Sequence, residues 1–236
     1  MKSFRQEITE QIERIPKGRI FTAKDLTFDV SKTANVNVLL AELVKKGRIK
    51  RIEKGAYYRF GMMKYGLGPK PIYQEEKIRY ILSKTGGYLS GYYAYNLMGL
   101  TEQVPTVITI ATPNPVRAFR FVNLRFNCIK ACKGNFKPDE VEYLRVLDVV
   151  NHIKHVPGRT GDDVYRELKE LYFSHYTDKE IDRIAKLSEY YPPVTKTILS
   201  LLLDETGHKK ISDNIKRTIN PITFNKYLMI YNYGTT

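Results

Sequence analysis

The sequence contains no tryptophan, only two cysteines and no long apolar run. Cys128 and Cys132 are too few for a fold held together by disulfides, which excludes the small secreted scaffolds and fits a reducing compartment. The longest apolar stretches, residues 107–111 and 198–203, fall far short of the roughly 18 to 20 residues of a membrane-spanning helix. The first residues have no apolar core before their first charges, so we expect no secretory signal and a cytoplasmic protein without membrane partners.

Positive charge is what the sequence has in excess. Lysine and arginine number 39 against 25 aspartate and glutamate residues, which gives a net charge of +14. The other proportions, with 42% hydrophobic residues, 15 glycines and 11 prolines, are those of an ordinary globular protein. The length of 236 residues favours two modest domains over one large one. An excess of this kind is compatible with a polyanionic partner, although it does not bear on the fold.

Residues 61–72 carry three glycines and two prolines without hydrophobic periodicity, which is typical of a linker. They separate a predicted first domain, residues 1–64, from a predicted second domain, residues 72–207. Residues 208–236 are predicted to be a tail of uncertain structure. The first domain holds 15 basic and 7 acidic side chains, a net charge of +8, so more than half of the excess lies there.

Helical spacing and capping signals predict two helices at the start of the first domain. Isoleucines at helical spacing predict a helix from Phe4 that stops at Pro16. Thr22 followed by Asp25 is a variant of the capping box and predicts a short second helix to about Phe28.

A longer helix and a hairpin complete the first domain. The helix, capped by Ser31 or Thr33, has a full apolar stripe made of Val36, Leu39, Leu40, Leu43 and Val44. Residues 48–60 alternate around a Glu-Lys-Gly turn and predict a basic β-hairpin. Helix, short helix, longer helix and basic hairpin is the order of a winged helix-turn-helix, a module that binds DNA or, in some proteins, docks another protein.

The side of the longer helix opposite its apolar stripe carries small and amide side chains. Such a surface can approach the bases in a major groove about 12 Å wide, where an Asn amide pairs with adenine and a methyl group contacts thymine. We expect base contacts from Ala34, Asn35, Asn37 and Val38. We expect phosphate contacts from Lys24, Lys32, Thr33, Lys45, Arg48, Lys50, Arg51 and Lys54. Glu42, which phosphates would repel, is expected to pair with Lys45 or Lys46.

Several segments resemble a known family. Residues 15–26 (IPKGRIFTAKDL), 41–52 (AELVKKGRIKRI) and 54–58 (KGAYY) resemble the N-terminal domain of AbiEi-type transcriptional regulators, the antitoxins of bacterial type IV toxin–antitoxin systems known from abortive phage infection. Residues 89–100 (LSGYYAYNLMGL), the predicted strand at 107–112 and residues 190–199 resemble the second domain of the same group.

The resemblance implies a repressor that binds inverted repeats of double-stranded DNA upstream of its own operon. It also implies a functional partner, a nucleotidyltransferase-like toxin that is countered without a stable complex. The longer helix is entered by residues 31–37 (SKTANVN) where the family more usually has small and basic residues, so we expect a different operator sequence.

The second domain is predicted to be α+β, with a small antiparallel sheet and several C-terminal helices. Predicted helices cover residues 74–84 and 90–98, and predicted strands cover 106–111, 118–122 and 124–131. Four further helices are expected at 139–152, 162–173, 178–189 and 193–203, the third of them with a capping box from Thr177 to Glu180.

No catalytic or metal-binding pattern stands out in the second domain. The predicted strands carry no Asp or Glu for a nuclease metal, and acidic pairs lie at helix starts, where they complement the helix dipole. Cys128 and Cys132 on one strand would be about 13 Å apart, too far to share a zinc ion. There is no Walker A sequence and no nucleophile elbow. We therefore expect no enzyme activity, cofactor or metal.

Arg117, Arg120 and Arg125 are a possible second basic face that could extend a DNA footprint or meet an acidic partner. The sequence has no coiled-coil heptads, so we expect a monomer or weak dimer that pairs on DNA. Two other functions stay open at this point. One is a free-standing winged-helix regulator without a toxin, and the other is a nucleic-acid-processing enzyme targeted by the winged helix.

Overall fold

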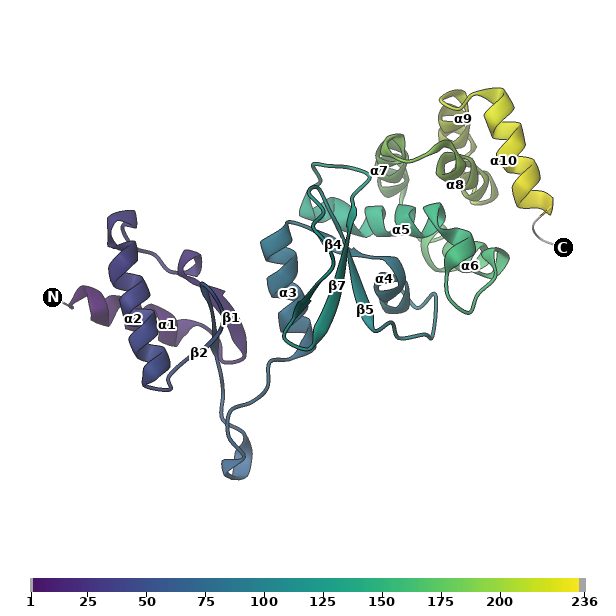
Figure 1. Ribbon diagram of the computed structural model, residues 1–236. Coiled ribbons are helices and arrows are strands. Elements are labelled where there is room, and N and C mark those ends of the chain that lie inside the picture. Colours follow the sequence, from purple (N-terminus) through teal and green to yellow (C-terminus); the bar gives the residue numbers. More distant parts are fainter. Residues whose placement is uncertain (1, 234–236) are drawn as a thin grey trace. The chain divides into compact units, whose positions relative to one another are not determined.

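The computed structural model describes residues 2–233, and the chain divides into two compact units, residues 1–85 (unit 1) and residues 86–236 (unit 2). Helices and small sheets occur in both units, so the protein is α+β, as the sequence predicts (Figure 1). None of the helices among the described residues is long and apolar enough to cross a membrane.

Unit 1 packs two helices on a small antiparallel sheet. Its elements are α1 (Phe4–Arg14), β1 (Arg19–Thr22), α2 (Thr33–Lys45), β2 (Lys50–Glu53), β3 (Ala56–Arg59) and α3 (Gln74–Thr85). The strands are ordered β1-β3-β2, with antiparallel pairing throughout. One buried cluster joins α1, α2 and the sheet, made of Ile8, Ile12, Phe21, Leu26, Val36, Leu39, Leu40, Leu43, Ile49 and Tyr57.

The predicted second helix is wrong. Residues 23–25 form only a single 3-10 turn, although Thr22 and Asp25 do form the predicted capping box, with the Thr22 amide 2.7 Å from the Asp25 carboxylate. A second 3-10 turn, Val30–Lys32, leads directly into α2. Because the chain already turns helically before Thr33, α2 begins without a side-chain cap, and the predicted caps bond elsewhere: Ser31 donates to Asp29 and Thr33 to the Val30 carbonyl.

Helix α3, which the sequence analysis assigned to the second domain, falls in unit 1 and binds the edge strand β1. The Glu76 carboxylate accepts the Ile20 amide at 2.6 Å, and the Arg79 guanidinium donates to the Ile20 carbonyl at 2.8 Å. Arg79 also donates to Glu76 at 2.6 Å. The two side chains thus satisfy the backbone groups that an edge strand leaves without a strand partner.

Unit 2 contains a four-stranded sheet and a larger number of helices. The first half comprises β4 (Tyr88–Ser90), α4 (Gly91–Leu97), β5 (Val107–Thr112), β6 (Phe119–Phe121) and β7 (Leu124–Lys130). The second half is helical, with α5 (Val141–Asn151), α6 (Gly161–Leu168), α7 (Asp178–Leu187), α8 (Pro193–Glu205), α9 (Lys209–Arg217) and α10 (Pro221–Tyr233). Helix α6 continues as a π-helical turn, Lys169–Phe173, and the capping box predicted for α7 is confirmed, with the Thr177 amide 2.8 Å from Glu180.

The sheet of unit 2 is mixed, which corrects the predicted antiparallel sheet. Its order is β4-β5-β7-β6, and β5 pairs with β7 in parallel. Strand β6, which follows β5 in sequence, does not pair with it but lies at the edge of the sheet. Strand β7 then turns back from β6 and lies between β6 and β5. Strand β4 was not predicted, because its three residues precede a helix and are too few for a period-2 pattern.

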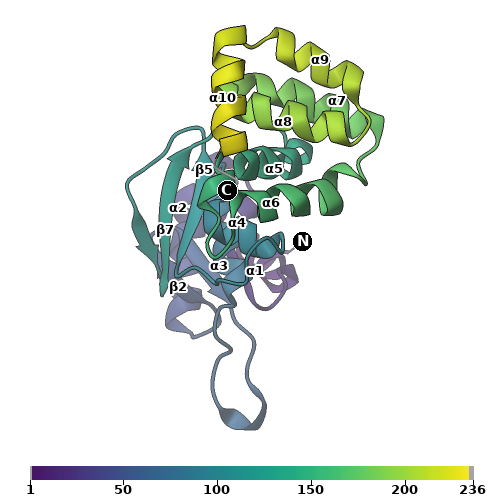
Figure 2. The ribbon, with the colours of Figure 1, turned by 90° about the vertical axis from the view of Figure 1, so that its right-hand side faces the viewer.

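The sequence left the structure of residues 208–236 open, and two helices, α9 and α10, form most of the described part of that segment. Helix α9 packs on α8, with the Ser212 hydroxyl 2.8 Å from the Ser200 carbonyl, and Ile215 and Ile219 are buried. Helix α10 packs against α8 as well (Figure 2). Residues 234–236 of the predicted tail lie outside the described residues.

Candidate nucleic-acid interface

Helix α2 buries one side and exposes the other. The buried side is Val36, Leu39, Leu40 and Leu43, as the apolar stripe predicts. The exposed side includes all four predicted base-contact residues, Ala34, Asn35, Asn37 and Val38, together with Ala41. Ala34 lies four residues before Val38, which lies three before Ala41, so these small side chains form one row on the helix; Asn35 is three residues before Val38 and Asn37 four before Ala41, so the two amides flank that row. The surface thus combines small side chains with two exposed side-chain amides, those of Asn35 and Asn37.

A hairpin of basic character follows α2. Strands β2 and β3 are joined by Lys54 and Gly55, and Gly55 has a φ of +81°, a conformation that side-chain-bearing residues rarely adopt. The register shifts between Arg51 and Glu53, a β-bulge. Residues Lys50, Arg51 and Lys54 are exposed along this hairpin, whereas the strand β3 behind them is largely buried.

The predicted phosphate-contact residues differ in what already engages them. Among the described residues, no hydrogen bond or ion pair involves the side chains of Lys24, Lys45, Lys50 and Lys54. The Lys32 ammonium lies 4.8 Å from the centre of the Phe4 ring, and the Arg51 side chain makes a long contact of 3.4 Å to the Glu53 carbonyl. Four lysines of unit 1 therefore have their charges available to a partner.

Two acidic side chains near this surface are neutralised within unit 1. Glu42 of α2 forms an ion pair with Arg5 of α1, not with Lys45 or Lys46 as expected. The packing of α1 on α2 places the Arg5 guanidinium next to the Glu42 carboxylate. Glu53 accepts hydrogen bonds from Tyr80 at 2.7 Å and Lys84 at 2.6 Å. Partial burial acts to raise the pKa of Glu53, but the bonds from Lys84 and Tyr80 outweigh it, so the pKa lies below its ordinary value. The carboxylates therefore repel a polyanion less than their number suggests.

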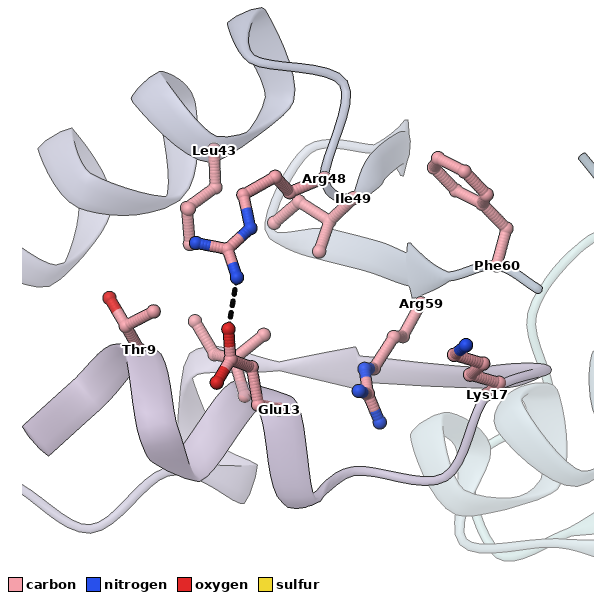
Figure 3. A pocket seen from close by; sticks show the side chains of 9 residues that line it. Thr9, Glu13, Lys17, Leu43, Arg48, Ile49, Arg59 and Phe60 are labelled. Atoms are coloured by element: carbon pink, nitrogen blue, oxygen red, sulfur yellow. Dashed lines mark hydrogen bonds and ion pairs between the residues drawn. The ribbon is translucent and has the colours of Figure 1, made fainter. Parts of the chain in front are cut away.

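A pocket of about 300 Å³ lies in unit 1 between α1 and the segment from α2 to β2 (Figure 3). Leu43, Ile49 and Phe60 line it with apolar surface, and Arg48 reaches across it to form an ion pair with Glu13. Both side chains are about half exposed, and an ion pair of this kind contributes little to stability. Arg48, a predicted phosphate contact, is thus held by an internal partner that a phosphate can replace at small cost.

The possible second basic face lies in unit 2. Arg120 of β6 and Arg125 of β7 are directly opposite each other, and Val107 of β5 is the partner of Arg125 on its other side. Arg117 precedes β6, and all three arginines are exposed. None of the three guanidinium groups has a hydrogen bond or ion pair among the described residues. Strand pairing therefore brings Arg120 and Arg125 together on one exposed surface.

A buried polar cluster in unit 2 was missed by sequence reasoning. The Asp148 carboxylate in α5 accepts hydrogen bonds from Ser90 at 2.6 Å, Tyr191 at 2.7 Å and Tyr88 at 3.0 Å. Burial raises the pKa of Asp148 above its ordinary value, although the three hydroxyls act in the opposite direction. The partners are more than 40 residues away in sequence, so no local pattern could show the cluster. Since each hydrogen-bond partner of Asp148 is a hydroxyl of the protein itself, we interpret the cluster as one that stabilises the fold and not as a ligand site.

Metal ligands are not gathered in the part of the chain that the structure describes. No group of three or more His, Cys, Asp and Glu side chains there is placed to hold a metal ion. Cys128 lies in β7 and Cys132 beyond its end, and both are free thiols. Neither residue has a metal-binding neighbourhood.

Comparisons with known proteins add little. No protein-family model matches the chain, and no curated protein matches it either. Among solved structures, the chain is similar to the crystal structure of the RV2827C protein from Mycobacterium tuberculosis, with 15% sequence identity and a TM-score of 0.47. That match covers 90% of this chain and 80% of the other. A similarity of this size carries no information on function.

Proposed function

We propose that the protein is a sequence-specific DNA-binding transcriptional regulator that binds DNA through unit 1. The observation that carries this proposal is the exposed surface of α2, where Ala34, Asn35, Asn37 and Val38 lie together while the opposite side is buried. A helix needs such a division to be both anchored in a core and presented to a major groove.

The arrangement of the elements supports a winged helix-turn-helix for unit 1. Helix α1, strand β1, two 3-10 turns, helix α2 and the β2–β3 hairpin follow one another, and β1 pairs with β3 to close the sheet. In this interpretation α2 is the recognition helix and the hairpin is the wing. The predicted second helix is reduced to 3-10 turns, so the connection from β1 to α2 lacks the full helix of a standard helix-turn-helix.

Base readout is assigned to the amides and phosphate contact to the lysines. Asn35 and Asn37 each offer a donor and an acceptor that match the edge of adenine, and Val38 offers methyl groups to thymine. Lys24, Lys45, Lys50 and Lys54 have no side-chain partner in the described part of the chain and carry the electrostatic part of binding. Arg48 and Lys32 join them by exchanging their contacts with Glu13 and Phe4.

The finer function rests on the family resemblance. We propose that the protein represses its own operon at inverted repeats and acts as the antitoxin of a type IV toxin–antitoxin system. The free-standing regulator differs only in having no toxin partner. Expression of the neighbouring gene with and without this protein separates the two, since an antitoxin restores growth that a nucleotidyltransferase-like toxin arrests.

A gel-shift titration of the full-length protein tests the DNA-binding proposal. The probes are a duplex from the region upstream of its own gene and a duplex of the same composition with scrambled sequence, each at two salt concentrations. We expect preferential binding to the upstream duplex that weakens as salt rises. Equal binding to both duplexes contradicts sequence-specific regulation, and no binding to either contradicts DNA binding altogether.

A further inference from the structure

Residues 61–70, here called the arm, leave β3 and extend away from the sheet of unit 1 (Figure 2). The two legs of the arm hold each other through backbone hydrogen bonds, from Lys70 to Gly61 at 2.7 Å and from Met63 to Gly68 at 2.8 Å. At its base the Tyr58 hydroxyl lies 3.2 Å from the Pro71 carbonyl. The linker expected from the sequence is therefore a hydrogen-bonded structure.

The arm exposes large apolar side chains on its legs and at its tip. Tyr65 is 94% exposed, Leu67 70% and Met62 60%, three such residues within six positions. Single exposed apolar residues are ordinary, whereas several together on a projecting element indicate a surface that binds something. Tyr65 also has a φ of 60°, which costs free energy for a residue with a side chain, and its exposed ring recovers little of that cost within unit 1.

Charge narrows the choice of partner. Residues 61–72 contain Lys64 and Lys70 and no acidic residue, and both lysines are exposed. A second copy of this chain would bring an arm of the same charge and a total of +14, so the two would repel each other. A polyanion is attracted. The arm continues directly from the basic hairpin assigned to DNA phosphates, which favours DNA over an anionic lipid surface.

We propose that the arm is a second DNA-contacting element, with Leu67 and Tyr65 entering the minor groove and Lys64 and Lys70 on the flanking phosphates. The minor groove is about 6 Å wide, too narrow for a helix but open to side chains at a tip. Apolar side chains that enter it unstack base steps and bend the duplex. This inference rests on the proposed DNA-binding function of unit 1.

The test compares the full-length wild-type protein with the double variant Y65A/L67A on the duplex upstream of its own gene. The matched control is L97A/V104A, which removes two exposed apolar side chains from unit 2. Gel-shift titrations at two salt concentrations give affinity, and permanganate reactivity of thymines reports unstacked bases. Thermal unfolding by circular dichroism verifies that each variant is folded.

We expect the wild-type protein to make thymines in the bound duplex reactive to permanganate. The Y65A/L67A variant should lose that reactivity and bind about tenfold or more weakly, with the same salt dependence because no phosphate contact is removed. The control should behave as the wild type does.

Four outcomes overturn the inference. If the wild type fails to bind DNA, the proposed function falls and the arm inference falls with it. If Y65A/L67A binds and unstacks DNA as the wild type does, the arm inference falls and the proposed function stands. Conversion of a wild-type dimer to a monomer by Y65A/L67A in sedimentation equilibrium assigns the arm to a second copy. Unchanged DNA binding with lost binding to phosphatidylserine vesicles assigns it to a lipid surface.

Discussion

Arg120 lies directly opposite Arg125 in the β6–β7 hairpin, so that two like charges are neighbours on one exposed surface of unit 2. Opposed like charges destabilise an antiparallel pair, and neither guanidinium has an acidic partner among the described residues. The surface therefore combines a local cost in stability with a charge suited to an anionic partner.

The substitution R120E should stabilise the protein by roughly 0.2 to 1 kcal/mol, because it replaces repulsion with attraction across the strand pair. Urea unfolding at low salt measures the gain, which should shrink at high salt as the charges are screened. R117E is the matched control, since Arg117 precedes the strand and is not paired opposite a cation. An equal gain from R117E would show that reduced net charge, not the pairing, is responsible.

The substitution N35A should cost roughly 1 to 3 kcal/mol of binding free energy on the preferred duplex and much less on the scrambled one. The reason is that an amide reading a base edge contributes only where the matching base is present. Competitive gel shifts measure the difference. N135A, which removes an exposed amide from unit 2, serves as control. A loss of the same size on both duplexes would contradict base readout by Asn35.

The substitution R51A should weaken binding to every duplex to a similar degree. Arg51 is a phosphate contact expected from the sequence, so its removal should also reduce the slope of log affinity against log salt by about 0.9. Titrations at four salt concentrations determine that slope. The K179A variant removes an exposed cation from α7 of unit 2 and should leave the slope unchanged. An unaltered slope in R51A would remove Arg51 from the interface.

The substitution E76Q should destabilise the protein by roughly 1 to 3 kcal/mol. Glu76 is buried, and its carboxylate bonds the Ile20 amide and Arg79 at once, whereas a glutamine amide must direct donor hydrogens toward a guanidinium. Urea unfolding followed by circular dichroism measures the loss. The neighbouring E75Q changes the same charge at an exposed position and should have little effect.

The substitution D148N should change how stability depends on pH. The pKa of Asp148 is raised by burial, so the folded state holds this proton more tightly than the unfolded state. Its favourable contribution is complete below the unfolded pKa, near 3.9, and is lost as pH rises through the folded value. The stability of D148N relative to the wild type should therefore increase from about pH 4 toward neutrality.

Urea unfolding midpoints of D148N and the wild type between pH 4 and pH 7 measure this trend. D182N, which removes an exposed carboxylate from α7, is the control for the loss of one negative charge. A relative stability of D148N that falls with pH would mean that the three hydroxyls outweigh burial.

The capping boxes and the stripe of α2 were predictable because their partners lie within four residues of one another. Thr22 with Asp25 and Thr177 with Glu180 form as expected, although the first box closes only a 3-10 turn. Leu40 and Leu43 are buried while Asn35 is exposed, as helical periodicity requires. DNA contact by Asn35 stays a prediction.

Longer-range pairings were not predictable. The ion pair of Glu42 with Arg5 depends on how α1 crosses α2, whereas the sequence suggested neighbours on the same helix. The parallel pairing of β5 with β7 depends on which gap the β6–β7 hairpin fills. A parallel and an antiparallel sheet both satisfy the hydrophobic pattern of these strands, so only the packing of the whole unit selects between them.

The sequence by itself determined the basic charge, the α+β class, the apolar stripe of α2 and the exposed residues opposite that stripe. These follow from composition and short-range periodicity. The tertiary structure alone decided the helices after residue 208, the Asp148 cluster, the hydrogen bonds of Glu76 and Arg79 to β1, and the hydrogen-bonded arm. Each of these depends on backbone or side-chain groups of distant segments meeting in space, and no local pattern specifies which of the possible partners a buried polar group will find.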